Sequence, residues 1–182
     1  MPAKRHSMNL PTKRCMPICW WLDSTTRRIA KPARQRTSCP RLIASGKPAL
    51  VLPYIGMPPP IFSNVLVAWK ETPQAAHALS AALPLLASAN AVHIAIDGDI
   101  SAQNKSALRK LLHCHGLAEP EFHALSSSAA DAGALMLSMA ADVSADLMVM
   151  GCCGHSRARE LVLGGASRSV LGAMTLPVLM AH

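Results

Sequence analysis

Four glycines near the carboxyl end of the chain have the spacing of an anion-binding loop. Gly151 and Gly154 lie three residues apart, and the pair Gly164 and Gly165 follows after nine intervening residues. Glycines allow backbone N–H groups to approach a ligand and to point inward, and a helix that begins at the last glycine adds its own unpaired N–H groups. Phosphate is the ligand that suits such a loop. A purely structural turn is an equal alternative, because most loop glycines serve turn geometry.

The spacing of these glycines excludes two common phosphate-binding motifs. Neither G-x-G-x-x-G nor G-x-x-x-x-G-K-[ST] occurs in the chain. Cys152 and Cys153 precede Gly154 and His155, which raises the alternative of thiol catalysis. A nucleophile also needs a base and a third group that orients the base, and no third group is identifiable. We therefore predict no catalytic residue.

Short apolar runs alternate with stretches of helical periodicity along most of the chain. The alternation is typical of a parallel sheet with right-handed crossovers and helices on both faces. In such sheets, ligands bind outside the carboxyl ends of the strands, where the strand order reverses. The loops after Trp69 and after Met150 can meet there if the first and fourth strands are neighbours. We expect strands at 65–69, 91–96, 122–125, 147–150 and 178–181, and helices at 72–88, 101–115, 129–143 and 166–173.

Charge divides the chain into two unequal parts. The first 48 residues hold eleven Lys and Arg against one acid, a net charge of +10, whereas the rest hold seven against nine, a net charge of −2. We predict a basic segment without a fold of its own at 1–41, a strand and a Pro-rich linker at 42–60, and one α/β domain at 61–182. Because the basic charge lies outside that domain and aromatic residues are few, nucleic-acid binding is the least favoured function.

Several other classes of protein are disfavoured by composition. No run of eighteen apolar residues and no secretory signal is present, and six cysteines without a regular framework indicate a reducing compartment, so we predict a cytoplasmic protein that does not enter the membrane. Cys15 and Cys19 lack two further ligands at ordered spacing. The histidines are scattered over different expected elements, and His113 and His115 face different sides of a helix. We therefore predict no metal site.

Three motifs together resemble the universal stress protein family. They are V-L-V-A-W at 65–69, D-L-M-V-M-G-C-C-G-H-S-R at 146–157 with its downstream glycines, and P-V-L-M-A at 177–181. The resemblance covers 62–182 and implies a five-stranded parallel sheet of order 3-2-1-4-5 with a Rossmann-like arrangement. It also implies a homodimer through the fifth strand and, in one branch of the family, ATP or AMP, with Mg²⁺. Residues 42–56 resemble the end of a preceding domain in a tandem protein.

In the nucleotide-binding branch, the matching positions place Ala68 and Lys70 beside the base and ribose, and Met150 before the loop. The branch has an acid where Lys70 stands and Ser or Thr where Gly165 stands. Lysine can instead pair with a phosphate as a point charge, and Ser167 can supply a displaced hydroxyl. The candidate nucleotide-binding residues are Ala68, Lys70, Met150, Gly151, Gly154, His155, Gly164, Gly165, Ala166 and Ser167.

Two functions remain open on this resemblance. The first is a stress-response domain that binds an adenine nucleotide, with at most weak ATP hydrolysis, since no base for an attacking water is identifiable. The second is an interaction module of the same fold that binds no nucleotide and assembles through its fifth strand.

Overall fold

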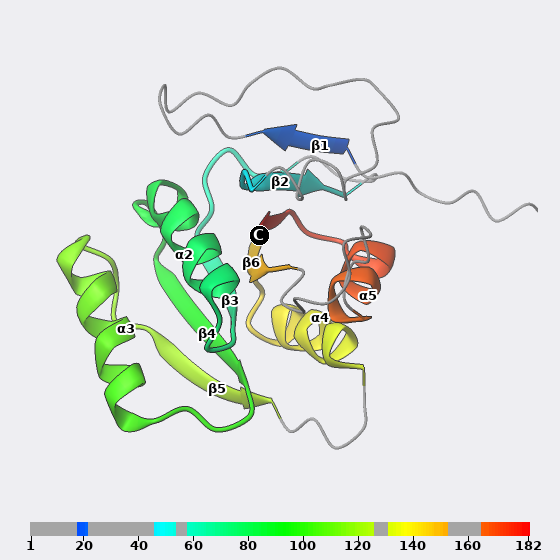
Figure 1. Ribbon diagram of the computed structural model, residues 1–182. Coiled ribbons are helices and arrows are strands. Elements are labelled where there is room, and N and C mark those ends of the chain that lie inside the picture. The colour runs from blue at the N-terminus through cyan, green and yellow to red at the C-terminus, as the bar shows by residue number, and fades with distance from the viewer. Residues whose placement is uncertain (1–17, 22–45, 54–57, 126–130, 153–164) are drawn as a thin grey trace, which may run out of the picture.

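The computed structural model describes residues 18–21, 46–53, 58–125, 131–152 and 165–182. These residues form one open sheet flanked by helices (Figure 1). In chain order the elements are β1 (Ile18–Trp21), β2 (Ala49–Leu52), β3 (Asn64–Trp69), α2 (Pro73–Leu86), β4 (Ala91–Asp97), α3 (Ala102–Cys114), β5 (Glu121–Leu125), α4 (Ala132–Asp142), β6 (Leu147–Gly151), α5 (Gly165–Ala173) and β7 (Val178–Ala181).

The sheet contains five parallel strands in the predicted order. The full order is β1-β2-β7-β6-β3-β4-β5, and β3 to β7 pair with one another in parallel. Numbering only these five along the chain gives 3-2-1-4-5, so the predicted α/β class and strand order are confirmed. The first and fourth of these strands, β3 and β6, are neighbours.

Two antiparallel strands extend the sheet beyond β7. The predicted strand at 49–52 is present as β2 and pairs with β7, with Leu50 opposite Leu179. β1 then pairs with β2 and lies inside the basic segment, for which the sequence predicts no fold of its own. β1 is therefore an additional strand at the edge of the sheet, next to β2. Among the described residues the sheet therefore has seven strands, where the sequence predicts five strands and a remnant strand.

Helices cover both faces of the sheet, as predicted. Val65 and Val67 of β3 belong to a core cluster with α2 and α3, whereas Leu66 and Ala68 belong to a second cluster with α4 and α5. This division follows from the alternation of side chains along a strand. In Figure 1, α2 and α3 lie to one side of β3 and β4, and α4 and α5 lie to the other side near β6. The strands buried on both faces read as nearly continuous apolar runs.

The helix ends follow the capping signals in the sequence. The Thr72 hydroxyl accepts the Ala75 N–H at 3.3 Å ahead of Pro73, and the Ser101 hydroxyl accepts the Asn104 N–H at 3.2 Å. Gly116 has a positive φ of 69° after α3, as expected of a residue just past a helix. The helix expected from residue 129 begins at Ala132, because Asp131 caps it by accepting the Gly133 N–H at 2.9 Å.

Asp146 joins the amino ends of β3 and β6. Its carboxylate accepts the N–H groups of Ser63 at 2.7 Å and Asn64 at 3.2 Å, and its own N–H donates to the Asn64 carbonyl at 2.9 Å. These bonds set the register in which Val65 lies beside Leu147. The same register then determines which residues are adjacent at the carboxyl ends of the two strands.

Candidate functional site

Ala68 and Met150 lie side by side at the carboxyl ends of β3 and β6. They are register partners in the parallel ladder, and both are almost fully buried on the face covered by α4 and α5. The chain leaves β3 toward β4 on one side and leaves β6 toward β7 on the other. The strand order therefore reverses between β3 and β6, which is where open α/β sheets bind ligands.

Gly151, the last residue of β6, allows the backbone of α2 to come close. A Cβ atom placed on Gly151 would lie 2.6 Å from the Ala75 nitrogen and 2.7 Å from the Gln74 carbonyl carbon. No side chain fits at those distances, so this position requires glycine for packing. The amino-terminal turn of α2 is thereby held against the end of β6. This terminus is capped within the chain, because Pro73 has no N–H and the Ala75 N–H donates to the Thr72 hydroxyl.

The first turn of α5 supplies a second helix amino terminus at this edge. Gly165 begins the helix and is exposed, and a Cβ atom built on it would meet nothing within 4 Å. Ala166 is half-buried, and Ser167 is only 4% exposed. The hydroxyl predicted to replace the missing Ser or Thr at position 165 thus lies on the buried side of α5. Gly165 itself is the open position.

Comparison with solved structures identifies the fold. A universal stress protein from Archaeoglobus fulgidus DSM 4304 matches with a TM-score of 0.61 and 22% identity, over 77% of this chain and 51% of that chain. The universal stress protein UspA from Lactobacillus plantarum matches with a TM-score of 0.52 and 15% identity, over 68% of this chain and 100% of that chain. This chain has the universal stress protein fold.

A third solved structure is that of a complex with a ligand. It is a universal stress protein in complex with cAMP, which matches with a TM-score of 0.51 and 24% identity over 67% of this chain and 98% of that chain. The chain thus spans about half the length of the first of these structures and nearly all of the other two. No family model matches the sequence, and no curated protein matches it.

Lys70, at the position after β3 in this universal stress protein fold, is paired with an acid from the next strand. Its ammonium lies 3.8 Å from the Asp97 carboxylate at the end of β4, and the lysine side chain is 67% exposed. This ion pair brings the Asp97 carboxylate to the edge of the sheet where the nucleotide-binding branch of the family has an acid in place of Lys70. The exposed ammonium remains accessible to a bound anion.

Three of the ten candidate residues, Gly154, His155 and Gly164, lie outside the described residues, as does Cys153. Cys152 is described and is 2% exposed. Its N–H donates to the Ala181 carbonyl at 2.9 Å, and its thiol donates to the same oxygen at 3.2 Å. This buried thiol, which donates to a backbone carbonyl, has the environment of a structural cysteine.

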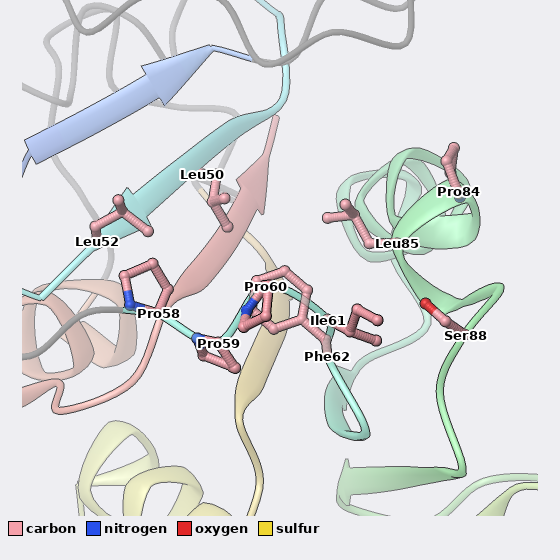
Figure 2. A pocket seen from close by; sticks show the side chains of 10 residues that line it. All are labelled: Leu50, Leu52, Pro58, Pro59, Pro60, Ile61, Phe62, Pro84, Leu85 and Ser88. Atoms are coloured by element: carbon pink, nitrogen blue, oxygen red, sulfur yellow. The ribbon is translucent and has the colours of Figure 1, made fainter.

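A cavity of about 460 Å³ opens at the other end of the universal stress protein fold (Figure 2). Leu50 and Leu52 of β2 line one side, the run Pro58–Phe62 crosses it, and the last turns of α2 close the other side. Phe62 precedes β3, so the cavity lies near the amino ends of the strands. It is therefore separate from the carboxyl edge at which the sequence places a nucleotide.

Histidines that are thirty residues apart in the sequence meet on neighbouring strands. His93 of β4 and His123 of β5 approach to 3.1 Å between Nδ1 and Nε2, and Glu121 lies beside both. Burial lowers the pKa of His93, the Glu121 carboxylate raises it, and His123 lowers it further; the net direction is downward. In the sequence these histidines are scattered over different expected elements, and no metal site is predicted there. The usable signal was that the second and third parallel strands are adjacent in the predicted order.

In the described part of the chain, no helix combines the length and the apolar character that a membrane span requires.

Proposed function

We propose that this chain is a universal stress protein of the nucleotide-binding branch, and that the carboxyl edge of β3 and β6 binds an adenine nucleotide, ATP or AMP, with Mg²⁺. The observation that carries the proposal is the adjacency of Ala68 and Met150 at the reversal of strand order, where α2 and α5 both begin. We place this activity in the cytoplasmic stress response. The proposed role is binding, with at most weak hydrolysis.

The physical chemistry of the edge favours a ligand with a phosphate. A helix amino terminus presents unpaired N–H groups and a positive dipole end, which together attract anions. Gly165 leaves the start of α5 open, and the exposed Lys70 ammonium adds positive charge nearby. That a protein of the same fold is described in complex with cAMP supports adenine as the base.

The decisive experiment places a carboxylate at the start of α5. Gly165→Asp adds a negative charge where the phosphate is proposed to lie, and an acid at a helix amino terminus does not harm folding. We expect calorimetric titration of the full chain to show at least a tenfold loss of ATP and AMP affinity in this variant, with adenosine binding unchanged. A Coulomb repulsion of about 1 to 4 kcal/mol at 4 Å is ample for that loss.

Gly172→Asp is the matched control for this experiment. Gly172 is exposed at the other end of α5, and a Cβ atom built there also meets nothing within 4 Å. The control should bind ATP like the wild type. Absence of binding by the wild type at millimolar ATP, AMP and cAMP would refute nucleotide binding. Equal binding by the two variants would refute the position of the phosphate.

A second proposal concerns the edge of β7. The resemblance implies a homodimer through this strand, yet β2 of the same chain is bonded to it. We propose that β2, within the segment 42–60, takes the place of a partner strand, as the last strand of a preceding domain would in a tandem protein. Support comes from the universal stress protein of Archaeoglobus fulgidus DSM 4304, whose match covers 77% of this chain, or about 140 residues. The domain at 62–182 has only 121 residues, so the matched region includes residues before 62.

Weakening β2 tests whether it competes with a second chain. Val51 is fully buried opposite Val178, so Val51→Asp should detach β2 and free the edge of β7. We expect light scattering to give a monomer mass for the wild type and a dimer mass for this variant. Ser106→Asp, an exposed change of equal charge on α3, should stay monomeric. A wild-type dimer whose mass is unaffected by Val51→Asp would contradict the proposal.

A further inference from the structure

His93, Glu121 and His123 form a compact group of potential metal ligands on β4 and β5. One ligand atom from each lies within 4.8 Å of the other two. The His93 Nδ1 is 3.1 Å from the His123 Nε2 and 3.4 Å from a Glu121 carboxylate oxygen, and that oxygen is 3.9 Å from the His123 Nε2. His93 lies in the amino-terminal half of β4, whereas His123 on β5 is two strands from Ala68 in the same cross-strand row, with Ala95 between them.

The register of the two strands brings these side chains to one face. His93 is the Cα partner of Glu121, and Ala95 is the partner of His123. Residues two apart on a strand point to the same side, so all three side chains project from the face that α4 and α5 cover elsewhere. The convergence is therefore built into the backbone pairing and needs no unusual side-chain conformation.

The separations match those between ligands that share one ion. Two atoms bound to tetrahedral zinc at about 2.0 to 2.1 Å lie about 3.3 Å apart. The three observed separations, 3.1, 3.4 and 3.9 Å, bracket that value. A small movement of the Glu121 side chain, which is 69% exposed, is enough to bring the third ligand into place.

We propose that His93, His123 and Glu121 bind one divalent transition-metal ion of the zinc class, with the fourth position open to solvent or to a small ligand. Two imidazoles and one carboxylate are a set that such ions prefer, whereas Mg²⁺ and Ca²⁺ prefer oxygen ligands alone. Zinc sites with three protein ligands and one open position are typical of sites that activate a bound water.

The competing interpretation is a hydrogen bond between the two rings, with Glu121 as a solvated neighbour. One imidazole donates and the other accepts, and no ion is involved. The two interpretations differ in what Glu121 does. An exposed carboxylate contributes little to a ring–ring hydrogen bond but supplies one of three ligands to a metal, so its removal separates them.

The test uses the full chain, with Zn²⁺ in thermal unfolding and Co²⁺ in absorption spectroscopy. Zinc should raise the melting temperature of the wild type, and cobalt should give visible d–d bands without a thiolate charge-transfer band, because no cysteine belongs to the group. Glu121→Gln and His123→Gln should each lower metal affinity roughly tenfold or more. Both sites are at least partly exposed, so these variants should fold.

Two exposed histidines on the surface near the end of α3 provide the control. His113→Gln combined with His115→Gln removes two imidazoles, and this variant should retain wild-type zinc stabilisation and cobalt bands. Retention of wild-type binding by both Glu121→Gln and His123→Gln would overturn the proposal, as would a cobalt spectrum dominated by thiolate ligation. Loss in His123→Gln but not in Glu121→Gln would also overturn it, because the three-ligand set would then be wrong.

Discussion

The carboxyl edge of β3 and β6 and the group on β4 and β5 are built from different parts of the chain. The edge consists of backbone: two helix amino termini, a glycine that admits the backbone of α2, and a small residue, Ala68, beside Met150. The group on β4 and β5 consists of side chains, two imidazoles and a carboxylate, which lie together through strand register. A backbone site suits an anion, whereas a side-chain site of this composition suits a cation.

Substitution of Gly151 should have the largest effect on stability, and that effect should arise at the carboxyl edge of β3 and β6. Gly151→Ala places a Cβ atom against the Gln74 and Ala75 backbone, which cannot move without shifting α2. We expect the free energy of unfolding in urea to fall by about 1 to 3 kcal/mol. Gly172→Ala, on the exposed side of α5, should raise that free energy by up to about 1 kcal/mol because alanine is the better helix former. Equal stability of the two variants would show that the contact at Gly151 is not close.

Asp146→Ala should have the next largest effect, and it acts at the opposite end of the same two strands. The change leaves the N–H groups of Ser63 and Asn64 without their carboxylate. Loss of about 1 to 2 kcal/mol in the free energy of unfolding follows from two partly buried donors left unpaired. Asp142→Ala, an exposed residue at the end of α4, is the control and should be neutral. A neutral Asp146→Ala would mean that apolar packing alone sets the register.

Lys70→Glu should separate the two sites by function. The change reverses the charge beside Asp97, so we expect calorimetry to show a roughly threefold to tenfold weaker affinity for ATP, a smaller loss for AMP and none for adenosine. The cobalt spectrum should not change, since Lys70 is not one of the three proposed ligands. Lys110→Glu, an exposed change of the same charge on α3, should leave ATP binding within twofold. Tighter ATP binding by Lys70→Glu would instead assign the position to the ribose hydroxyls.

Asp131→Asn should have the smallest effect and should depend on pH. A hydrogen bond from Ser169 and the Gly133 N–H lower the pKa of Asp131 below its ordinary value. The stability that this carboxylate contributes is therefore present above pH 3.8 and is lost as the pH falls through the lowered pKa. Melting curves of the wild type and Asp131→Asn should differ at pH 7 and converge once the pH has fallen below the lowered pKa of Asp131. A difference that persists in acid would show that the carboxylate charge is not responsible.

Much of the sheet was predictable because its signals are local. Helix-capping signals depend only on residues a few positions away in the sequence. The structure confirms those at Thr72 before Pro73, at Ser101 and at Gly116. The alternation of strands and helices then restricts the topology, because crossovers are right-handed. The reversal point between β3 and β6 follows from the order 3-2-1-4-5, which the family resemblance implies.

Other features depended on neighbours that are distant in the sequence. The hydroxyl of Ser167 stays a predicted phosphate ligand, and only the packing of α5 shows that this side chain is buried. The predicted strand at 49–52 and the predicted dimer both use the edge of β7, and only the pairing of β2 with β7 shows that they compete. The sequence of the basic segment does not predict β1, because this strand depends on its pairing with β2.

By itself the sequence determined the alternating elements and the parallel α/β class, since these depend on periodicity, capping and chain handedness within short windows. The order of β3 to β7 was implied by the resemblance to the universal stress protein family. The tertiary structure alone decided that His93, Glu121 and His123 share one face, that Lys70 pairs with Asp97, and that β2 covers β7. Each of these depends on strand register, in which a shift of one residue turns a side chain to the opposite face.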